Sequence, residues 1–215
     1  IANMVGREIT NQFPRDIVPR GKKVLEVKHL SSGNAVKDVS FEAYAGEVLG
    51  FAGLVGAGRT ETSRAIFGAD LKDGGEIILN GKELEIKCPS DAINAGIVLI
   101  PEDRKKDGLC TKLSIRDNIA LPNLPMISGK LTGKINKKSE AEMVNKGKSS
   151  LTIKMANAEV DAGTLSGGNQ QKIVVAKWLA RESEVIIFDE PTRGIDVAAK
   201  VEIYEIINEL KKQGK

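Results

Sequence analysis

The sequence contains few of the residues that mark disulfide-rich, membrane-spanning or nucleic-acid-binding proteins. Its only two cysteines, Cys88 and Cys110, have neither a zinc-binding spacing nor the pattern of a disulfide framework, which favours a reducing compartment. No apolar run approaches the roughly 18 residues of a membrane span, and no secretory signal opens the chain. The formal net charge is +3 and the Lys and Arg residues are scattered, so we expect no nucleic-acid partner.

The length of 215 residues fits one large domain with its own core, or at most two small ones. Residues 1–22 are polar, contain two prolines and show little periodicity, which predicts a linker. The chain starts without Met and stops within a helical pattern. We therefore expect a piece of a longer protein, in which a domain at 23–215 is truncated at its C-terminal end.

Strand and helix patterns alternate along the domain, which predicts an α/β fold with a mainly parallel core sheet. The apolar run at 48–52 is typical of a buried parallel strand, and a helical period follows it up to Gly68. The pair Asn80-Gly81 predicts the turn of an antiparallel hairpin. Ser90 can cap a short helix that leads into a strand at 96–101.

The middle of the chain has a different character. Residues 102–112 are highly charged and are predicted to form a loop. From 114 to about 160 the pattern is mostly helical and rich in Lys, which predicts a helical insertion into the domain.

The stretch GLVGAGRTE, residues 53–61, has the spacing of a phosphate-binding loop, GxxxxGK[ST]. Glycines let the backbone wrap a phosphate, so that successive N–H groups and the positive end of the following helix face it. Arg59 stands where the motif has Lys, while Thr60 keeps the hydroxyl that would bind Mg²⁺. By itself, the stretch is also compatible with a glycine-rich turn that binds nothing.

Two acids, Asp189 and Glu190, end the apolar stretch VIIFDE. Ligands of open α/β sheets bind at the carboxyl ends of the strands, where one acid can hold Mg²⁺ and the next can polarise an attacking water. Acids at a strand end are often only solvated turn residues, but the phosphate loop upstream favours the functional reading.

The stretch LSGGNQQ, residues 165–171, places Ser166, Gly167 and Gly168 at the start of a helix, which is again an anion-binding arrangement. With the phosphate loop and the two acids, it makes the chain resemble the nucleotide-binding domain of ABC-type ATPases over about residues 22–215. MVGRE, IPEDRKKDGL, LSGGNQQK and DEPTRGIDV further resemble the second, C-terminal ATPase domain of sugar-import ATP-binding proteins of the ribose/galactose/xylose type.

The resemblance implies a P-loop NTPase fold with an antiparallel β subdomain and a helical subdomain at about 114–160. It implies ATP and Mg²⁺ as cofactors, with Glu190 as the general base and Thr60, Asp189 and Glu102 near the metal. The implied nucleotide contacts are Gly53, Leu54, Val55, Gly56, Ala57, Gly58, Arg59, Thr60, Glu61, Glu102, Asp189, Ser166, Gly167 and Gly168. Asn169 stands where the signature usually has Gln, and 194–196 match the loop that crosses the dimer interface.

The implied setting is the cytoplasmic face of the cell membrane, where the domain is a peripheral part of an importer. Its implied partners are an N-terminal ABC domain in the same full-length chain, transmembrane permease subunits and, indirectly, a periplasmic or lipoprotein sugar-binding protein. The helical segment and the Glu102–Leu113 loop are expected to contact the permease. Since ABC domains pair head to tail, Ser166 and Gly168 would cap the nucleotide held by the partner domain.

Four departures from the family pattern predict a degenerate site. Arg59 replaces Lys, Glu102 replaces Gln, no aromatic lies between His29 and Val36 to stack on adenine, and the chain lacks the switch histidine. The leading hypothesis for the function is a regulatory domain that binds ATP and completes its partner's catalytic site. The alternatives are a fully active hydrolysing half, a nucleoside-type importer domain, and an ABC ATPase of DNA repair or translation, which usually has longer insertions.

Overall fold

The structure is a computed structural model that describes residues 13–215, and in it the chain forms two compact units. Of the described residues, the first unit contains 13–14, 100–182 and 190–206, and the second contains 15–99, 183–189 and 207–215. The MVGRE stretch of the predicted linker lies outside the described residues, and 13–22 form neither helix nor strand. No helix within 13–215 has the length and hydrophobicity needed to cross a membrane.

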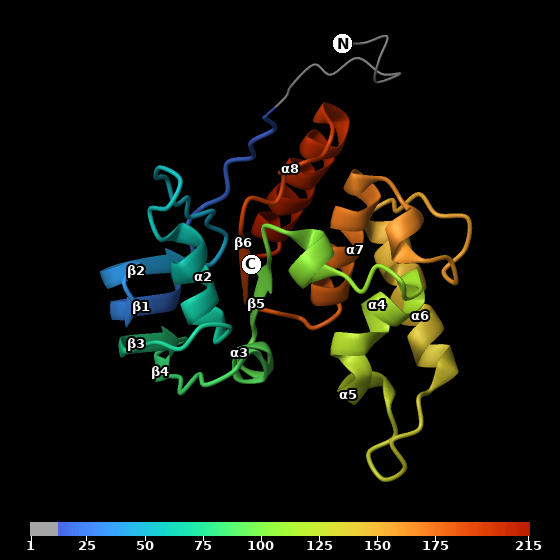
Figure 1. Ribbon diagram of the computed structural model, residues 1–215, viewed down its shortest axis with the longest axis horizontal. Helices are drawn as coiled ribbons and strands as arrows, with labels where there is room; N and C mark the ends of the chain where they lie inside the picture. The colour runs from blue at the N-terminus through green and yellow to red at the C-terminus, as the bar shows by residue number, and fades with distance from the viewer. Residues whose placement is uncertain (1–12) are drawn as a thin grey trace. The chain divides into compact units, whose positions relative to one another are not determined.

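The second unit contains a four-stranded sheet in the order β2-β1-β3-β4 (Figure 1). The strands are β1 (Lys23–Ser32), β2 (Val36–Tyr44), β3 (Gly74–Leu79) and β4 (Lys82–Glu83), and all three pairings are antiparallel. Their inward side chains are aliphatic and fully or almost fully buried, as for Val27, Leu30 and Ile77. This sheet is the antiparallel β subdomain implied by the family resemblance.

The Asn80-Gly81 hairpin prediction is confirmed. β3 and β4 pair antiparallel through Leu79 and Lys82, directly on either side of the turn. Asn80 and Gly81 have φ values of 50° and 78°, which is the backbone of the favoured two-residue turn.

Helix α3 (Pro89–Ala95) begins one residue before the predicted cap. Cys88, not Ser90, is the N-cap residue, and the Asp91 carboxylate accepts a hydrogen bond from the Cys88 backbone N–H at 3.1 Å. Proline suits the first position of a helix because its missing N–H has no partner there. The proline therefore sets the start that the serine was expected to set.

The predicted strand at 48–52 is absent. Val48, Leu49 and Phe51 are 57%, 42% and 42% exposed, and no strand is formed there. A strand requires a hydrogen-bonded neighbour, and the other sheet of the described residues consists of β5 (Ile97–Ile100) and β6 (Val185–Phe188) alone. The ring of Phe51 instead packs edge-on against Phe41, with 4.9 Å between the centroids.

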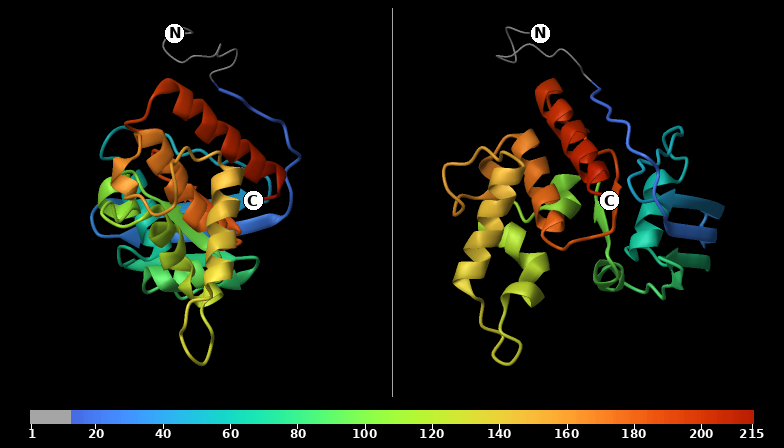
Figure 2. Two further views of the ribbon diagram at one scale, coloured as in Figure 1. Left: turned by 90° about the vertical axis from the view of Figure 1, so that its right-hand side faces the viewer. Right: turned by 180° about the vertical axis from the view of Figure 1, so that it is seen from behind.

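The first unit is mostly helical. Three of its helices, α4 (Ile115–Ala120), α6 (Lys137–Ser150) and α7 (Gly167–Leu179), pack against one another (Figure 2). The shorter turns are η2 (Leu121–Asn123), α5 (Leu124–Ile127) and η3 (Ala162–Thr164), and α8 (Val197–Lys212) continues into the second unit. The fully buried side chains Ile115, Ile119, Ile173 and Ile203 form its core.

Two sequence expectations for this unit need correction. The charged segment predicted as a loop contains one π-helical turn, η1 (Arg104–Gly108), because the Asp103 carboxylate caps it by accepting from the backbone N–H groups of Lys105 and Lys106. Within the predicted helical insertion, neither 128–136 nor 151–160 forms a helix.

Candidate functional site

The phosphate loop ends in helix α2 (Arg59–Phe67), which begins where the sequence predicts it. Gly56 and Gly58 have φ values of 81° and 82°, a region that favours glycine. A Cβ on Gly58 would lie 2.5 Å from the carbonyl oxygen of Ala35, so no side chain fits at that position. No side chain caps α2, which leaves its first turn suited to an anion.

The rest of the loop is exposed and closes on itself. The Ala57 backbone N–H donates to the carbonyl oxygen of Leu54 at 3.1 Å, and 53–57 are all exposed. The side chain of Arg59 runs back along the loop. A Cβ built on Gly53 would lie only 3.7 Å from its Cδ. A guanidinium at this place presents a wide planar group where the motif has a compact ammonium.

The two acids follow β6, as the sequence predicts. Asp189 is 8% exposed at the end of the strand, whereas Glu190 is exposed. Glu190 has a φ of 44°, an unfavourable backbone for a residue other than glycine, and such residues cluster at functional sites. Its carbonyl oxygen accepts from the Arg193 backbone N–H at 3.0 Å, which closes the turn after the strand.

Ser166 is the N-cap residue of α7, and its neighbours orient its hydroxyl group. Its Oγ accepts from the backbone N–H of Asn169 at 3.5 Å and from Asn169 Nδ2 at 3.1 Å. The other end of the same amide, Asn169 Oδ1, accepts from the Lys154 backbone N–H at 2.9 Å, which fixes which end of the amide faces the serine. The Ser166 oxygen accepts both of these hydrogen bonds, so its own O–H can donate to an acceptor outside the chain, such as a phosphate oxygen.

The glycines of the signature lie at close contacts. A Cβ on Gly168 would lie 2.6 Å from Cβ of Ala199 in α8, so the two helices approach closely there. A Cβ on Gly167 would lie 2.7 Å from Nη2 of Arg104. Asp196 accepts from the Ala199 backbone N–H at 2.9 Å and thereby caps the start of α8.

Arg104 is a site residue that reasoning from the sequence missed. Its guanidinium donates to Gln170 Oε1 at 3.3 Å and to the carbonyl oxygens of Arg193 and Gly194 at 3.0 and 3.3 Å. Its neighbour Glu102, the expected metal contact, forms an ion pair with the Arg193 side chain. No local pattern marks the contacts of Arg104, because its partners lie 66 to 90 residues away in sequence.

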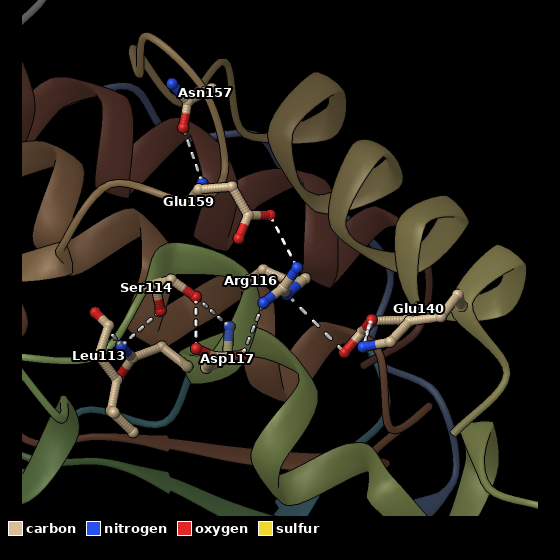
Figure 3. Close-up of polar contacts among 9 residues, drawn as sticks. Leu113, Ser114, Arg116, Asp117, Glu140, Asn157 and Glu159 are labelled. Atoms are coloured by element: carbon tan, nitrogen blue, oxygen red, sulfur yellow. Dashed lines mark hydrogen bonds and ion pairs between the residues drawn. The ribbon is translucent and has the colours of Figure 1, made fainter. Parts of the chain in front are cut away.

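A polar network supports the segment that leads into the signature (Figure 3). Arg116 of α4 pairs with Glu159 at 2.8 Å and lies 3.9 Å from Glu140 of α6. Ser114 caps α4, and its hydroxyl donates to Asp117, which holds the pKa of that carboxyl below its usual value. The network fixes 157–161 against α4 and α6, just before the signature begins.

The expected metal residues are divided between the units. Thr60 and Asp189 belong to the second unit and Glu102 to the first. Within the described part of the chain, no three or more His, Cys, Asp or Glu side chains gather as a metal site would require. A magnesium ion held by two protein groups and by nucleotide phosphates needs no such cluster, and a hydroxyl with a carboxylate suits that cation.

Comparison with known sequences gives a consistent result along the whole chain. Residues 36–193 match the profile of the family described as "ABC transporter". The chain is 50% identical over 214 residues to the ribose import ATP-binding proteins RbsA of Bacillus licheniformis and Bacillus subtilis. These alignments cover 100% of this chain and 43% of each relative, so the chain spans less than half their length.

Solved structures show the same fold. A nucleotide-free ATP-binding cassette from an ABC transporter gives a TM-score of 0.74 at 22% identity and covers 90% of this chain and 79% of its own. A dimeric cassette in a post-hydrolysis state, bound to ADP and Pi, gives 0.72 at 20% identity, with 89% and 84% covered. At such identities the likeness concerns the fold, and it confirms the predicted fold class.

Proposed function

The chain belongs to the ABC transporter family as an ATP-binding domain of the P-loop NTPase fold, and we propose that it is the C-terminal ATPase domain of a sugar importer. The observation that carries this proposal is the 50% identity, along the whole chain, to proteins named for ribose import. Because those relatives are more than twice as long, the proposal includes an N-terminal ABC domain in the same full-length chain.

The remaining partners follow from the same proposal. The domain lies at the cytoplasmic face of the membrane against permease subunits, which receive the sugar from a sugar-binding protein outside. The Glu102–Leu113 loop and the helical segment at 114–160 form the contact with the permease. Lys105 and Lys106 are exposed on this loop, which supports its assignment to an outside partner.

In its own nucleotide site the domain binds ATP weakly. The backbone at 53–60 would hold the phosphates, while Thr60 and Asp189 would hold Mg²⁺, which neutralises phosphate charge when bound. Arg59 folds back along the loop and cannot supply the point charge of a Lys. Glu102 is paired with Arg193, so its carboxylate is already engaged. These features support a site that binds nucleotide but hydrolyses it poorly.

Toward its partner the same domain contributes the signature. Since ABC domains pair head to tail, Ser166 and the first N–H groups of α7 would face the γ-phosphate of ATP held by the N-terminal domain. The orientation of the Ser166 hydroxyl, with Asn169 occupying its acceptor side, supports this role. The domain therefore completes a catalytic site that it does not itself hold.

Two single substitutions in the full-length importer test this division of roles. Ser166→Ala removes one hydrogen-bond donor aimed at developing charge, a loss of roughly 3 kcal/mol or about a hundredfold in ATP turnover. Glu190→Gln removes the general base of the domain's own site and should lower turnover only partly. The measurement is steady-state ATPase activity with the permease subunits present.

The control must separate lost catalysis from a lost helix cap. Asp91→Ala removes a side chain that accepts hydrogen bonds from backbone N–H groups at the start of α3, at a cost of about 1 kcal/mol, and should leave turnover near the wild-type rate. Gly168→Asp should also abolish activity, but it is a less selective variant because any side chain there meets Ala199. If Glu190→Gln lowers ATP turnover more than Ser166→Ala does, the domain's own site carries out most of the hydrolysis and the regulatory role is wrong.

A further inference from the structure

Arg104 joins three segments of the first unit that are far apart in sequence. From this arrangement we infer that Arg104 is a positioning residue, which locks the loop at 193–194 onto the start of the signature helix α7. The inference rests on the proposed function, because it concerns how this domain presents its signature to the nucleotide of its partner. The role assigned to Arg104 is to hold these segments in place through its hydrogen bonds to Gln170, Arg193 and Gly194.

The geometry of the guanidinium carries the inference. Nη1 donates to the carbonyl oxygen of Arg193 at 3.0 Å, Nη2 to that of Gly194 at 3.3 Å, and Nε to Gln170 Oε1 at 3.3 Å. Three donors of one rigid plane thus reach three acceptors on two separate segments. The planar fork of an arginine suits this task, whereas the single ammonium of a lysine cannot reach all three.

The acceptor on α7 is itself held in place. Gln170 is 3% exposed, and its Nε2 donates to the carbonyl oxygens of Gly163 and Leu165 at 3.2 and 3.0 Å. These bonds fix the orientation of the amide, so that Oε1 faces Arg104. Through Gln170, Arg104 is connected to Leu165, the first residue of the signature.

Gly167, the first glycine of the signature, lies directly beside the guanidinium of Arg104. A Cβ on Gly167 would lie 2.7 Å from Arg104 Nη2 and 3.2 Å from the carbonyl oxygen of Gly194. Its backbone does not have the positive φ that would demand glycine. A methyl group at this position would therefore displace the guanidinium and crowd the carbonyl oxygen of Gly194.

Arg193, one of the residues held by Arg104, also contacts Glu102 and Glu190. The side chain of Arg193 pairs with Glu102, and its backbone N–H donates to the carbonyl oxygen of Glu190. Arg104 and Glu102 both lie on the loop that we assign to the permease contact. A displacement of that loop would pull on the turn after Glu190 and on the signature together, which is a physical route for coupling.

The test uses the full-length importer with its permease subunits and measures ATP turnover as a function of ATP concentration. Arg104→Gln should lower kcat by about tenfold to a hundredfold, the loss typical of a misplaced catalytic segment, and change KM for ATP by less than about twofold. Arg104→Lys should not restore kcat. Lys82→Gln is the control, because it removes one positive charge from an exposed position of β4, outside the signature and the permease contact, and should leave kcat unchanged.

A second variant should displace the Arg104 guanidinium without replacing Arg104 itself. Gly167→Ala should fold, because the backbone at Gly167 does not have a positive φ, but its methyl group would push the guanidinium away. It should lower kcat as Arg104→Gln does, and the double variant should be no slower than the slower single variant, because both remove one interaction. Gly74→Ala, at the start of β3 where an added methyl group meets nothing within 4 Å, is the glycine control and should leave kcat unchanged.

Several outcomes would overturn the inference. These are a kcat for Arg104→Gln within about twofold of wild type, rescue by lysine, an effect on KM alone, or full additivity of the two substitutions. Its failure is distinguishable from that of the proposed function. If Ser166→Ala lowers turnover while Arg104→Gln does not, only the inference fails, whereas an unaffected Ser166→Ala variant would refute the proposed function itself.

Discussion

Replacement of the buried Lys177 should change how the stability of the chain depends on pH. It lies on α7, where its ammonium donates to the carbonyl oxygen of Gly108 and lies 5.0 Å from the ring centroid of Trp178. Burial lowers the pKa of Lys177 from 10.5 to about 8 in the folded chain. Replacing it with Met keeps most of the apolar stem and removes the titrating group.

The sign and size of the effect follow from this shift. Between pH 8 and 10.5 the unfolded chain binds more protons at Lys177 than the folded chain, so the free energy of unfolding rises with pH over this window. Each pKa unit corresponds to about 1.4 kcal/mol, which gives roughly 3 kcal/mol over the whole window and about 2 kcal/mol between about pH 7 and about pH 9.5. Lys177→Met should lack this rise.

The assay is urea unfolding of the wild-type and Lys177→Met chains at both pH values. The lost bond to Gly108 shifts the variant equally at both, so it cancels when the two differences in unfolding free energy are compared. Relative to wild type, the variant should be about 2 kcal/mol less stable near pH 9.5 than it is near pH 7. Lys146→Met, at an exposed position of α6, is the matched control and should follow the wild-type profile.

The reasoning would be refuted by a Lys177→Met chain whose unfolding free energy runs parallel to wild type between these pH values. A difference of opposite sign would also refute it, because it would mean that the folded structure favours the charged ammonium. A uniform offset alone would report only the lost hydrogen bond.

The remaining predictions concern nucleotide binding and coupling. Arg59→Lys should raise ATP affinity in calorimetry more than it raises the hydrolysis rate, since Glu102 still stands where the family has the Gln that contacts Mg²⁺. An unchanged affinity would contradict the role given to Arg59. Gly58→Ala should destabilise the chain by about 1–3 kcal/mol, through its left-handed backbone and its contact with Ala35, and a wild-type melting temperature would contradict this. The isolated chain should turn over ATP well below about 1 s⁻¹, and a rate of that order would show a competent site. Reversing the charges of Lys105 and Lys106 to Glu should uncouple sugar uptake from ATPase activity, and normal transport after reconstitution would exclude this loop as the coupling surface.

The features that the sequence determined by itself are those with a local physical cause. The Asn80-Gly81 turn and the start of α2 after Gly58 depend on backbone angles that glycine and asparagine tolerate best. Ser166 caps α7 because its side chain reaches a backbone N–H three residues ahead. Such causes act within a few residues, so a sequence pattern displays them completely.

Other features were decided only by the tertiary structure. The apolar run at 48–52 was expected to be a buried strand, but a strand exists only beside a hydrogen-bonded neighbour, and the described strands supply none there. Arg104 looked like one charge among many in a polar segment until the fold brought Gln170, Arg193 and Gly194 to its guanidinium. Composition and spacing describe what a residue can bind, whereas the path of the chain decides which partner, 66 or more residues away, comes within reach.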